Sequence, residues 1–247
     1  MAKRENDLGR DPIGKLLLRL AVPTVTAQLV NALYNIVDRI YISNIPLVGE
    51  TALAGVGVCG PVVTLIGAFA SLIGVGGAPL MSIRMGAGKT EEARRILSNS
   101  FLMLLILSGV LTTLFLLLKE HLLMWFGASD ATFGYANTYL TIYTAGTFFA
   151  LMATGMNSFL IAQGFSGLGM ATVMLGAVLN IILDPIFIFG LHLDVAGAAL
   201  ATVLSQMASC AFVLLSLRRK RMPVRLRWGR MELHIVRRVL AFGLSPF

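Results

Sequence analysis

The chain has 247 residues, of which 57% are hydrophobic and only 13% are charged, and its mean hydropathy is +0.82. Soluble domains carry roughly 25% charged residues, so these proportions and the long apolar runs exclude a soluble globular protein. The sequence also lacks the CxxC, HExxH, GxSxG and Walker-type spacings of known enzyme sites, and therefore indicates neither an enzyme nor a cofactor.

Four stretches of the chain contain no Asp, Glu, Lys or Arg: residues 51–83, 96–118, 131–183 and 195–217. A helix that crosses a bilayer needs about 20 apolar residues, and the third stretch is long enough for two such helices. The pattern predicts an all-α polytopic membrane protein in which six transmembrane helices form one lobe. The expected helices cover residues 14–43, 51–82, 97–118, 132–162, 169–190 and 196–217.

The predicted helices divide the chain into four parts. They are a cytoplasmic N-terminal segment (1–13), the six-helix lobe (14–217), a basic cytoplasmic inter-lobe loop (218–235) and the start of a seventh helix cut off at Phe247 (236–247). The first part is polar and has no cleavage site of the signal-peptide kind. Within the lobe, the glycine-rich sequence at 162–169 predicts a turn, and Pro23, Pro61 and Pro79 mark expected kinks.

The positive charges lie almost entirely on one side of the predicted lobe. The net charge is +8, and of the 20 basic residues only Arg39 and Lys119 fall on the opposite side. The positive-inside rule assigns the basic side, and with it the N-terminus, to the cytoplasm of a plasma (inner) membrane. The cluster "RRKRMPVRLRWGR" resembles a nucleic-acid patch in composition, but we interpret it as a loop that contacts anionic membrane lipid rather than nucleic acid.

Polar residues recur along the first predicted helix at spacings of 4, 3, 4 and 3, which places them on one helix face. They are Thr24, Gln28, Asn31, Asn35 and Asp38. In a membrane such a face must contact protein or a water-filled cavity. For Thr24, Gln28 and Asn31, interhelical hydrogen bonding and cavity lining are equally compatible with the pattern.

Two later helices carry matching polar residues. Asn180 and Asp184 are four residues apart on the fifth helix and share a face, and the sixth helix presents Ala198, Thr202 and Gln206 on one face. At a rise of about 1.5 Å per residue, these groups and Asp38 reach the same outer half of the bilayer.

An ionised carboxylate in hydrocarbon costs at least roughly 2.5–3.5 kcal/mol, so both acids need a partner. Carboxylate, amide and hydroxyl oxygens are hard ligands that suit Na⁺, while a buried carboxyl group also retains a proton readily. The residues therefore predict a cation or proton site at Asp38, Asn180, Asp184 and Thr202, with Na⁺ and H⁺ both open.

The smaller motifs have structural interpretations. The sequence "GVGG" at 74–77 predicts close packing between helices, and "GAGKTEEA" at 86–93 lacks the frame of a phosphate-binding loop. Cys59 and Cys210 lie in apolar runs and are expected to be buried, unpaired thiols.

At these residues the chain resembles the multidrug and toxic compound extrusion (MATE) family. The matching stretches are "LAVPTVTAQLVNALYNIVDRIYISNI", "LIGVGGAPLMSIRMGAGKTEEARRILSNS", "LNIILDPIFIFG" and "VAGAALATVLSQ". The resemblance implies an antiporter with two six-helix lobes that exports cationic or amphipathic drugs in exchange for Na⁺ or H⁺ by alternating access. This chain would be the N-terminal lobe, its partner the missing C-terminal lobe of the same chain, and its source bacterial.

The resemblance also implies roles for individual residues. The family's N-lobe cation site maps onto Asp38, Asn180, Asp184 and Thr202, with a backbone carbonyl from Ala198 and a contribution from Asn157. From their places on the polar helix faces, and independently of the resemblance, Gln28, Asn31, Asn35 and Gln206 are expected to line a cavity. The loop "QGFSGLGM" departs from the family pattern because it lacks charged residues, so we assign it no coupling role.

Three other functions are compatible with a polytopic lobe. A lipid-linked oligosaccharide flippase would need cationic residues for pyrophosphate, and the spans carry almost none. A membrane-embedded enzyme would need a catalytic motif that is absent here. A non-transporting scaffold would have no use for the buried acids.

Overall fold

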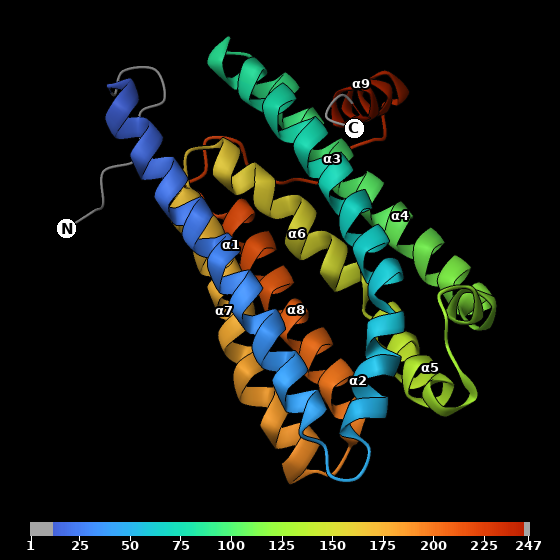
Figure 1. The fold of residues 1–247 in the computed structure, drawn as a ribbon. Coiled ribbons are helices and arrows are strands. Elements are labelled where there is room, and N and C mark those ends of the chain that lie inside the picture. Colours follow the sequence, from blue (N-terminus) through green and yellow to red (C-terminus); the bar gives the residue numbers. More distant parts are fainter. Residues whose placement is uncertain (1–11, 245–247) are drawn as a thin grey trace.

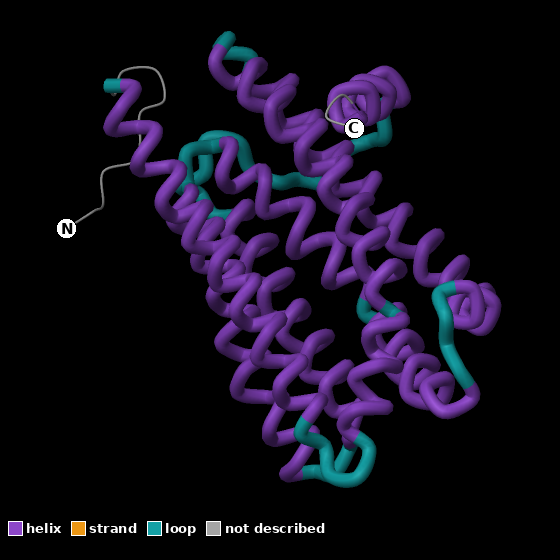
Figure 2. Tube along the Cα trace, viewed as in Figure 1, coloured by secondary structure: helices purple, strands orange, loops and turns teal. Residues whose placement is uncertain are grey.

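The computed structural model describes residues 12–244, and every regular element in that range is helical (Figures 1 and 2). The elements are α1 (Ile13–Ser43), α2 (Gly49–Val58), α3 (Gly60–Gly86), α4 (Thr90–Trp125), α5 (Asp130–Ala145), α6 (Thr147–Ala162), α7 (Ser166–Pro185), the π-helical turn η1 (Ile186–Gly190), α8 (Asp194–Arg218) and α9 (Leu233–Leu244). Among the described residues, five helices are long and apolar enough to cross a membrane, and α5 with α6 makes a sixth, bent span. The prediction of an all-α polytopic membrane protein is confirmed. Residues 1–11 of the predicted N-terminal segment and residues 245–247 of the predicted seventh helix lie outside the described range.

Two predicted helices are broken. The sequence analysis expected a kink at Pro61, close to the first break, and no irregularity at the second. The predicted helix at 51–82 is divided at Cys59 into α2 and α3. Pro61 lies in the first turn of α3, where its missing N–H needs no partner. The predicted helix at 132–162 is divided at Gly146 into α5 and α6, whose axes differ by 57°.

Three predicted boundaries also differ from the structure. The turn expected at 162–169 is shorter, because α7 already begins at Ser166. The last predicted helix begins at Leu233 instead of Val236, so the basic loop ends earlier than expected. Helix α4 extends beyond the predicted 97–118 at both ends, and Glu91 and Glu92 occupy its first turn, where acids interact favourably with the helix dipole.

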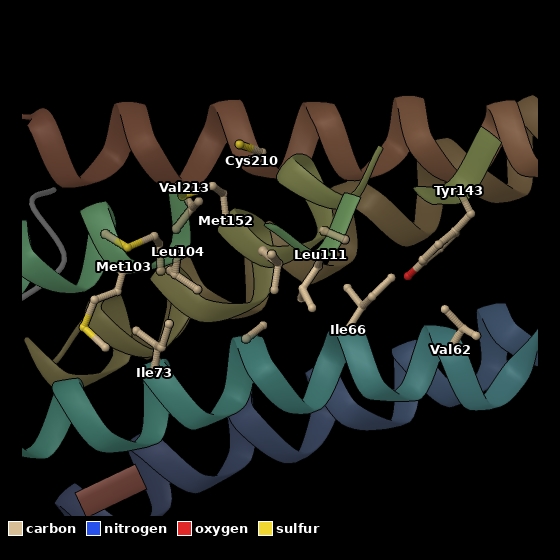
Figure 3. Close-up of a cluster of buried hydrophobic side chains, with 14 of the residues drawn as sticks. Val62, Ile66, Ile73, Met103, Leu104, Leu111, Tyr143, Met152, Cys210 and Val213 are labelled. Carbon is tan, nitrogen blue, oxygen red and sulfur yellow. The ribbon is translucent and has the colours of Figure 1, made fainter. Parts of the chain in front are cut away.

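The helices form one bundle in which α1 packs along α7 and α7 packs along α8 (Figure 1). On the other side, α3 packs against α4 and α6, and α9 crosses the outside of α3. Buried apolar side chains from α3, α4, α6 and α8 meet between these two sides (Figure 3). They include Val62, Ile66, Ile73, Met103, Leu104, Leu111, Met152, Cys210 and Val213. Cys59 and Cys210 are buried free thiols, as predicted.

The "GVGG" sequence lies where α3 touches its neighbours most closely. A Cβ atom on Gly74 would lie 2.8 Å from the Ser158 hydroxyl oxygen, and one on Gly77 would lie 2.6 Å from the Phe159 ring. Contacts under 3.0 Å are closer than a real Cβ atom allows. The prediction of close helix packing at this sequence is confirmed.

The basic linker between α8 and α9, residues 219–232, folds back onto the end of the lobe at which α3 ends and α4 begins; we call this end the basic end. The Val224 amide donates a hydrogen bond of 2.8 Å to the Gln163 side-chain oxygen at the end of α6. The Ser98 hydroxyl donates to the Arg227 carbonyl at 2.7 Å, and the Asn99 side-chain oxygen accepts from the Glu232 amide at 2.7 Å. The linker is therefore fastened to α4 and α6 by its backbone.

Replacing Gln163 by Leu is expected to loosen this linker. The substitution leaves the buried Val224 amide without its acceptor, which costs about 1–3 kcal/mol. Limited proteolysis with trypsin in detergent should then cleave the arginine-rich linker several-fold faster than in the unaltered protein. Thr138→Ala removes an exposed hydroxyl that bonds only to its own helix and serves as the control. Equal cleavage rates in the two variants would contradict the role of Gln163.

Candidate functional site

Two carboxyl groups from different helices meet at the side of the bundle formed by α1 and α7. Asp38 lies near the end of α1, and Asp184 is the second-last residue of α7. The two carboxyl groups lie within hydrogen-bonding reach of each other. Asp184 has no exposed surface and Asp38 is half-buried, so water screens the acid pair only weakly.

Two neutral polar residues complete this cluster. The Asn180 side-chain amide donates a hydrogen bond of 3.1 Å to Asp184 and lies 3.4 Å from the Thr202 hydroxyl on α8. The structure thus brings together the four residues that the sequence analysis placed in one site. The i, i+4 spacing of Asn180 and Asp184 accounts for their contact, and the packing of α8 against α7 supplies Thr202.

The cluster contains oxygen atoms that lack a hydrogen-bond donor. Among the described residues, the Asp38 Oδ1, Asp184 Oδ2 and Asn180 Oδ1 atoms are buried and accept no hydrogen bond. Buried acceptors without donors are costly, and most are satisfied in folded proteins. Carboxylate and amide oxygens that face one another suit a hard cation, and protonation of one carboxyl group would also supply a donor.

A cavity of about 620 Å³ lies beside the acid cluster and is lined by α1, α3, α6, α7 and α8, with one residue of α5. Its volume is within the range of about 300–1,000 Å³ typical of small-molecule sites. The wall includes all four residues that were predicted to line it, namely Gln28, Asn31, Asn35 and Gln206, and also Thr24. Asn180 and Thr202 belong to both the wall and the acid cluster, so the cluster lies at one end of the cavity.

The remaining two predicted site residues lie in different places. Ala198 is fully buried one helical turn before Thr202 on α8. Asn157 lines the cavity near the end of α6, and its amide donates a hydrogen bond of 3.3 Å to the Gly169 carbonyl. Within residues 12–244, no hydrogen bond joins Asn157 to Asn180 or Asp184. Asn157 is therefore a residue of the cavity wall and makes no direct contact with the acid cluster.

Sequence reasoning missed two tyrosines of the cavity wall, Tyr34 and Tyr143. The Gln206 amide lies 3.4 Å from the Tyr143 hydroxyl, and the Tyr143 side chain extends toward Ile66 (Figure 3). A tyrosine in an apolar helix is unremarkable by itself, and only the spacing of Tyr34, three residues after Asn31, hints at the shared face.

The π-helical turn η1 was also not predicted. It begins directly after Asp184 and Pro185. Proline cannot donate the backbone hydrogen bond of a regular helix, and π-helical turns occur frequently at functional sites. The dipeptide "DP" is the sequence feature from which an irregular turn at this position could have been predicted.

A bundle of spanning helices around a polar cavity with buried acids defines the class of membrane transporters. Within that class the chain belongs to the MatE family, because the MatE family model matches residues 23–186. This finding confirms the resemblance noted in the sequence. Members of the family are transporters and not enzymes, in agreement with the absence of enzyme motifs.

Known proteins resemble the chain over most of its length. The multidrug export protein MepA of Staphylococcus haemolyticus is 29% identical over 208 residues, which is 84% of this chain and 46% of MepA. An FAD transporter of Shewanella oneidensis is 27% identical over 198 residues, covering 78% of this chain and 43% of the transporter. The crystal structure of a MATE protein in the bent conformation superposes with a TM-score of 0.86 at 32% identity, covering 94% of this chain and 52% of that protein. The chain therefore spans about half the length of the relatives it matches.

Proposed function

We propose that the chain is the N-terminal lobe of an exporter that couples the efflux of cationic or amphipathic compounds to the inward movement of Na⁺ or H⁺. The observation that carries this proposal is the close pair of half-buried Asp38 and fully buried Asp184 at the end of a polar cavity. Acids of this kind inside a membrane protein are rare and mark ion pathways or proton relays.

The acid pair acts as the coupling site. With both carboxylates ionised, Asp38 on α1 and Asp184 on α7 repel each other. Binding of Na⁺, or protonation of one carboxyl group, removes this repulsion and draws α1 toward α7. Because both helices also line the cavity, the change alters the space available to a substrate. Coupling requires only that the ion stabilises the state that binds substrate poorly.

The cavity wall favours a cationic or amphipathic substrate. Hydroxyl, amide and aromatic groups line it, and no charged residue of the described chain does so. Amide oxygens without donors, such as those of Asn157 and Gln206, favour ligands that donate hydrogen bonds. This substrate class agrees with MepA, which is named a multidrug export protein.

Anionic substrates fit the cavity poorly. The FAD transporter relative and a lipid-linked oligosaccharide flippase would both handle phosphate groups, which proteins usually hold with Arg or Lys. A wall without basic residues disfavours both functions. A scaffold without transport would gain nothing from two acids that lack hydrogen-bond donors.

The proposal includes a membrane orientation and a partner. The basic end of the lobe faces the cytoplasm of a plasma membrane, so the N-terminus and residues 219–232 are cytoplasmic. A second six-helix lobe of the same polypeptide completes the transport pathway, since the relatives are about twice as long. The relatives' organisms agree with a bacterial source.

A transport assay with two separate gradients tests this function. The protein expressed from its whole gene is reconstituted into liposomes, and movement of a cationic dye is followed under a Na⁺ gradient at constant pH or a pH gradient without Na⁺. One gradient is expected to accelerate dye transport at least tenfold over gradient-free liposomes. The membrane potential is clamped with a potassium ionophore so that dye redistribution by voltage is excluded. Dye movement that responds to neither gradient would overturn the proposal.

A further inference from the structure

A second pocket, unconnected with the acid cluster, lies at the basic end of the lobe. It has a volume of about 390 Å³ and is formed by α4, the last residue of α8 and the linker. Its wall consists of two arginines and three apolar residues: Arg218, Arg227, Phe101, Leu226 and Trp228. Two guanidinium groups beside aromatic rings are a combination that neither the coupling site nor the substrate cavity uses.

The pocket has a fixed frame. The Ser98 hydroxyl donates to the Arg227 carbonyl at 2.7 Å, and the Leu226 amide donates to the Leu217 carbonyl at 3.0 Å. The Trp228 ring meets the Phe101 ring edge-on, with centroids 5.5 Å apart. Hydrogen bonds and ring packing on both sides of Arg227 thus hold this arginine and its neighbour Trp228 against α4, and they shape the pocket before any ligand binds.

The two guanidinium groups are available to an anion. Arg218 and Arg227 are exposed, and in the described part of the chain neither side chain has a hydrogen-bond or ion-pair partner. Glu232, the acid of the same linker, lies 3.8 Å from Arg95 and 3.8 Å from His234 instead. Arginine binds phosphate oxygens through paired hydrogen bonds, which makes a phosphate group the matching ligand.

The pocket lies at the boundary between the charged and the charge-free parts of the helices that form it, where we expect the lipid headgroups to lie. The charge-free part of α4 begins after Arg95, and at about 1.5 Å per residue Phe101 lies about 9 Å further into the apolar region. Arg218 marks the corresponding boundary on α8, since it is the last residue of that helix. Trp228 nonetheless remains 70% exposed, which is typical of a tryptophan at the membrane interface.

We propose that this pocket binds an anionic phospholipid. Arg218 and Arg227 hold the phosphate of the headgroup, and the exposed ring of Trp228, which packs against the buried Phe101 ring, contacts the glycerol and the first acyl carbons. A free phosphate would use the arginines but would leave the aromatic surface exposed, so the membrane lipid is the better match. The bound lipid stabilises the linker that leads into α9. This inference is independent of the proposed transport function.

Lipid titration with native mass spectrometry tests the site. The whole protein is purified in detergent and titrated with phosphatidylglycerol or with phosphatidylcholine. Arg218→Gln with Arg227→Gln removes the charge-assisted hydrogen bonds to the phosphate and should weaken the binding of the first phosphatidylglycerol at least roughly thirtyfold. The charge-matched pair Arg219→Gln with Arg225→Gln lies outside the pocket wall and should change binding by less than about threefold.

Each other outcome contradicts the proposal. Equal weakening in both pairs of variants would mean that the whole linker attracts lipid without a defined site. If Arg218→Gln with Arg227→Gln leaves lipid binding unchanged, or if phosphatidylcholine binds as tightly as phosphatidylglycerol, the two arginines do not select an anionic lipid. Displacement of the lipid by millimolar glycerol phosphate would identify a soluble phosphate compound as the ligand. The variants Arg218→Lys and Arg227→Lys together keep the charge and are expected to show an intermediate loss, because lysine lacks the paired donors of arginine.

Discussion

Dye efflux driven by an ion gradient is expected to fall to background when Asp184 is replaced by Asn in the full-length transporter. The amide has nearly the shape of the carboxyl group, so it fits the same buried position beside Asn180. It carries no negative charge and cannot take up a proton, and it therefore can neither attract a cation nor relay H⁺. Efflux from cells or proteoliposomes that carry the variant measures the effect directly.

The expected result distinguishes loss of coupling from loss of the fold. A neutral amide removes the repulsion between the two acids and the cost of burying a charge, so the variant should unfold at a temperature no lower than that of the unaltered protein. Asp130→Asn is the matched control, because Asp130 is an acid in the first turn of α5 that does not line the cavity. This control should keep its efflux. Undiminished efflux by Asp184→Asn would remove the acid pair from the mechanism.

The acid cluster could be predicted because, in a regular helix, the spacing of residues in the sequence determines which side chains share a face. Asn180 and Asp184 had to share a face once they lay in one helix, and that contact is present. The common depth of Asp38, Asp184 and Thr202 followed from counting residues along spans that run in opposite directions. The free-energy cost of an unpaired acid in hydrocarbon also helped to predict the cluster, because an acid in an apolar span needs a partner wherever the helix lies.

The break at Gly146 could not be predicted in the same way, whereas Pro61 marked the position of the other break to within two residues. Hydropathy measures whether a residue suits the membrane, and the residues on both sides of Gly146 suit it equally. A break depends on how a helix packs against its neighbours. At Gly146, a Cβ atom would lie 2.6 Å from the Val203 side chain on α8, and no feature of the local sequence records that contact.

The folded linker was beyond prediction for a related reason. Its composition suggested only a basic loop, yet Gln163 and Asn99, both from other elements, accept its backbone amides. Hydrogen bonds between residues about 60 and 130 positions apart depend on the tertiary fold. The distribution of Lys and Arg yields a prediction of the side of the membrane on which the linker lies, but it contains no information on the conformation of the linker.

At Gly197, the packing of α8 bears directly on the acid cluster. Gly197 lies in the first turns of α8, five residues before Thr202, and it touches the backbone of the π-helical turn that follows Asp184. A Cβ atom at Gly197 would lie 2.7 Å from the Phe187 carbonyl carbon and 2.9 Å from the Ile188 nitrogen. Both are backbone atoms, so the clash cannot be relieved by rotating a side chain.

Gly197→Ala is therefore expected to push α8 away from η1 and to separate Thr202 from Asn180. Overpacking of this kind destabilises by about 1–3 kcal/mol, and thermal unfolding in detergent should show the loss. Ion-driven efflux should fall as well, because Thr202 and the acids would no longer form one cluster. Gly57→Ala is the matched control, since nothing lies within 4 Å of its added methyl group and alanine favours a helix by about 1 kcal/mol over glycine. If both variants unfold at the same temperature and retain efflux, the close contact between α8 and η1 does not hold the site together.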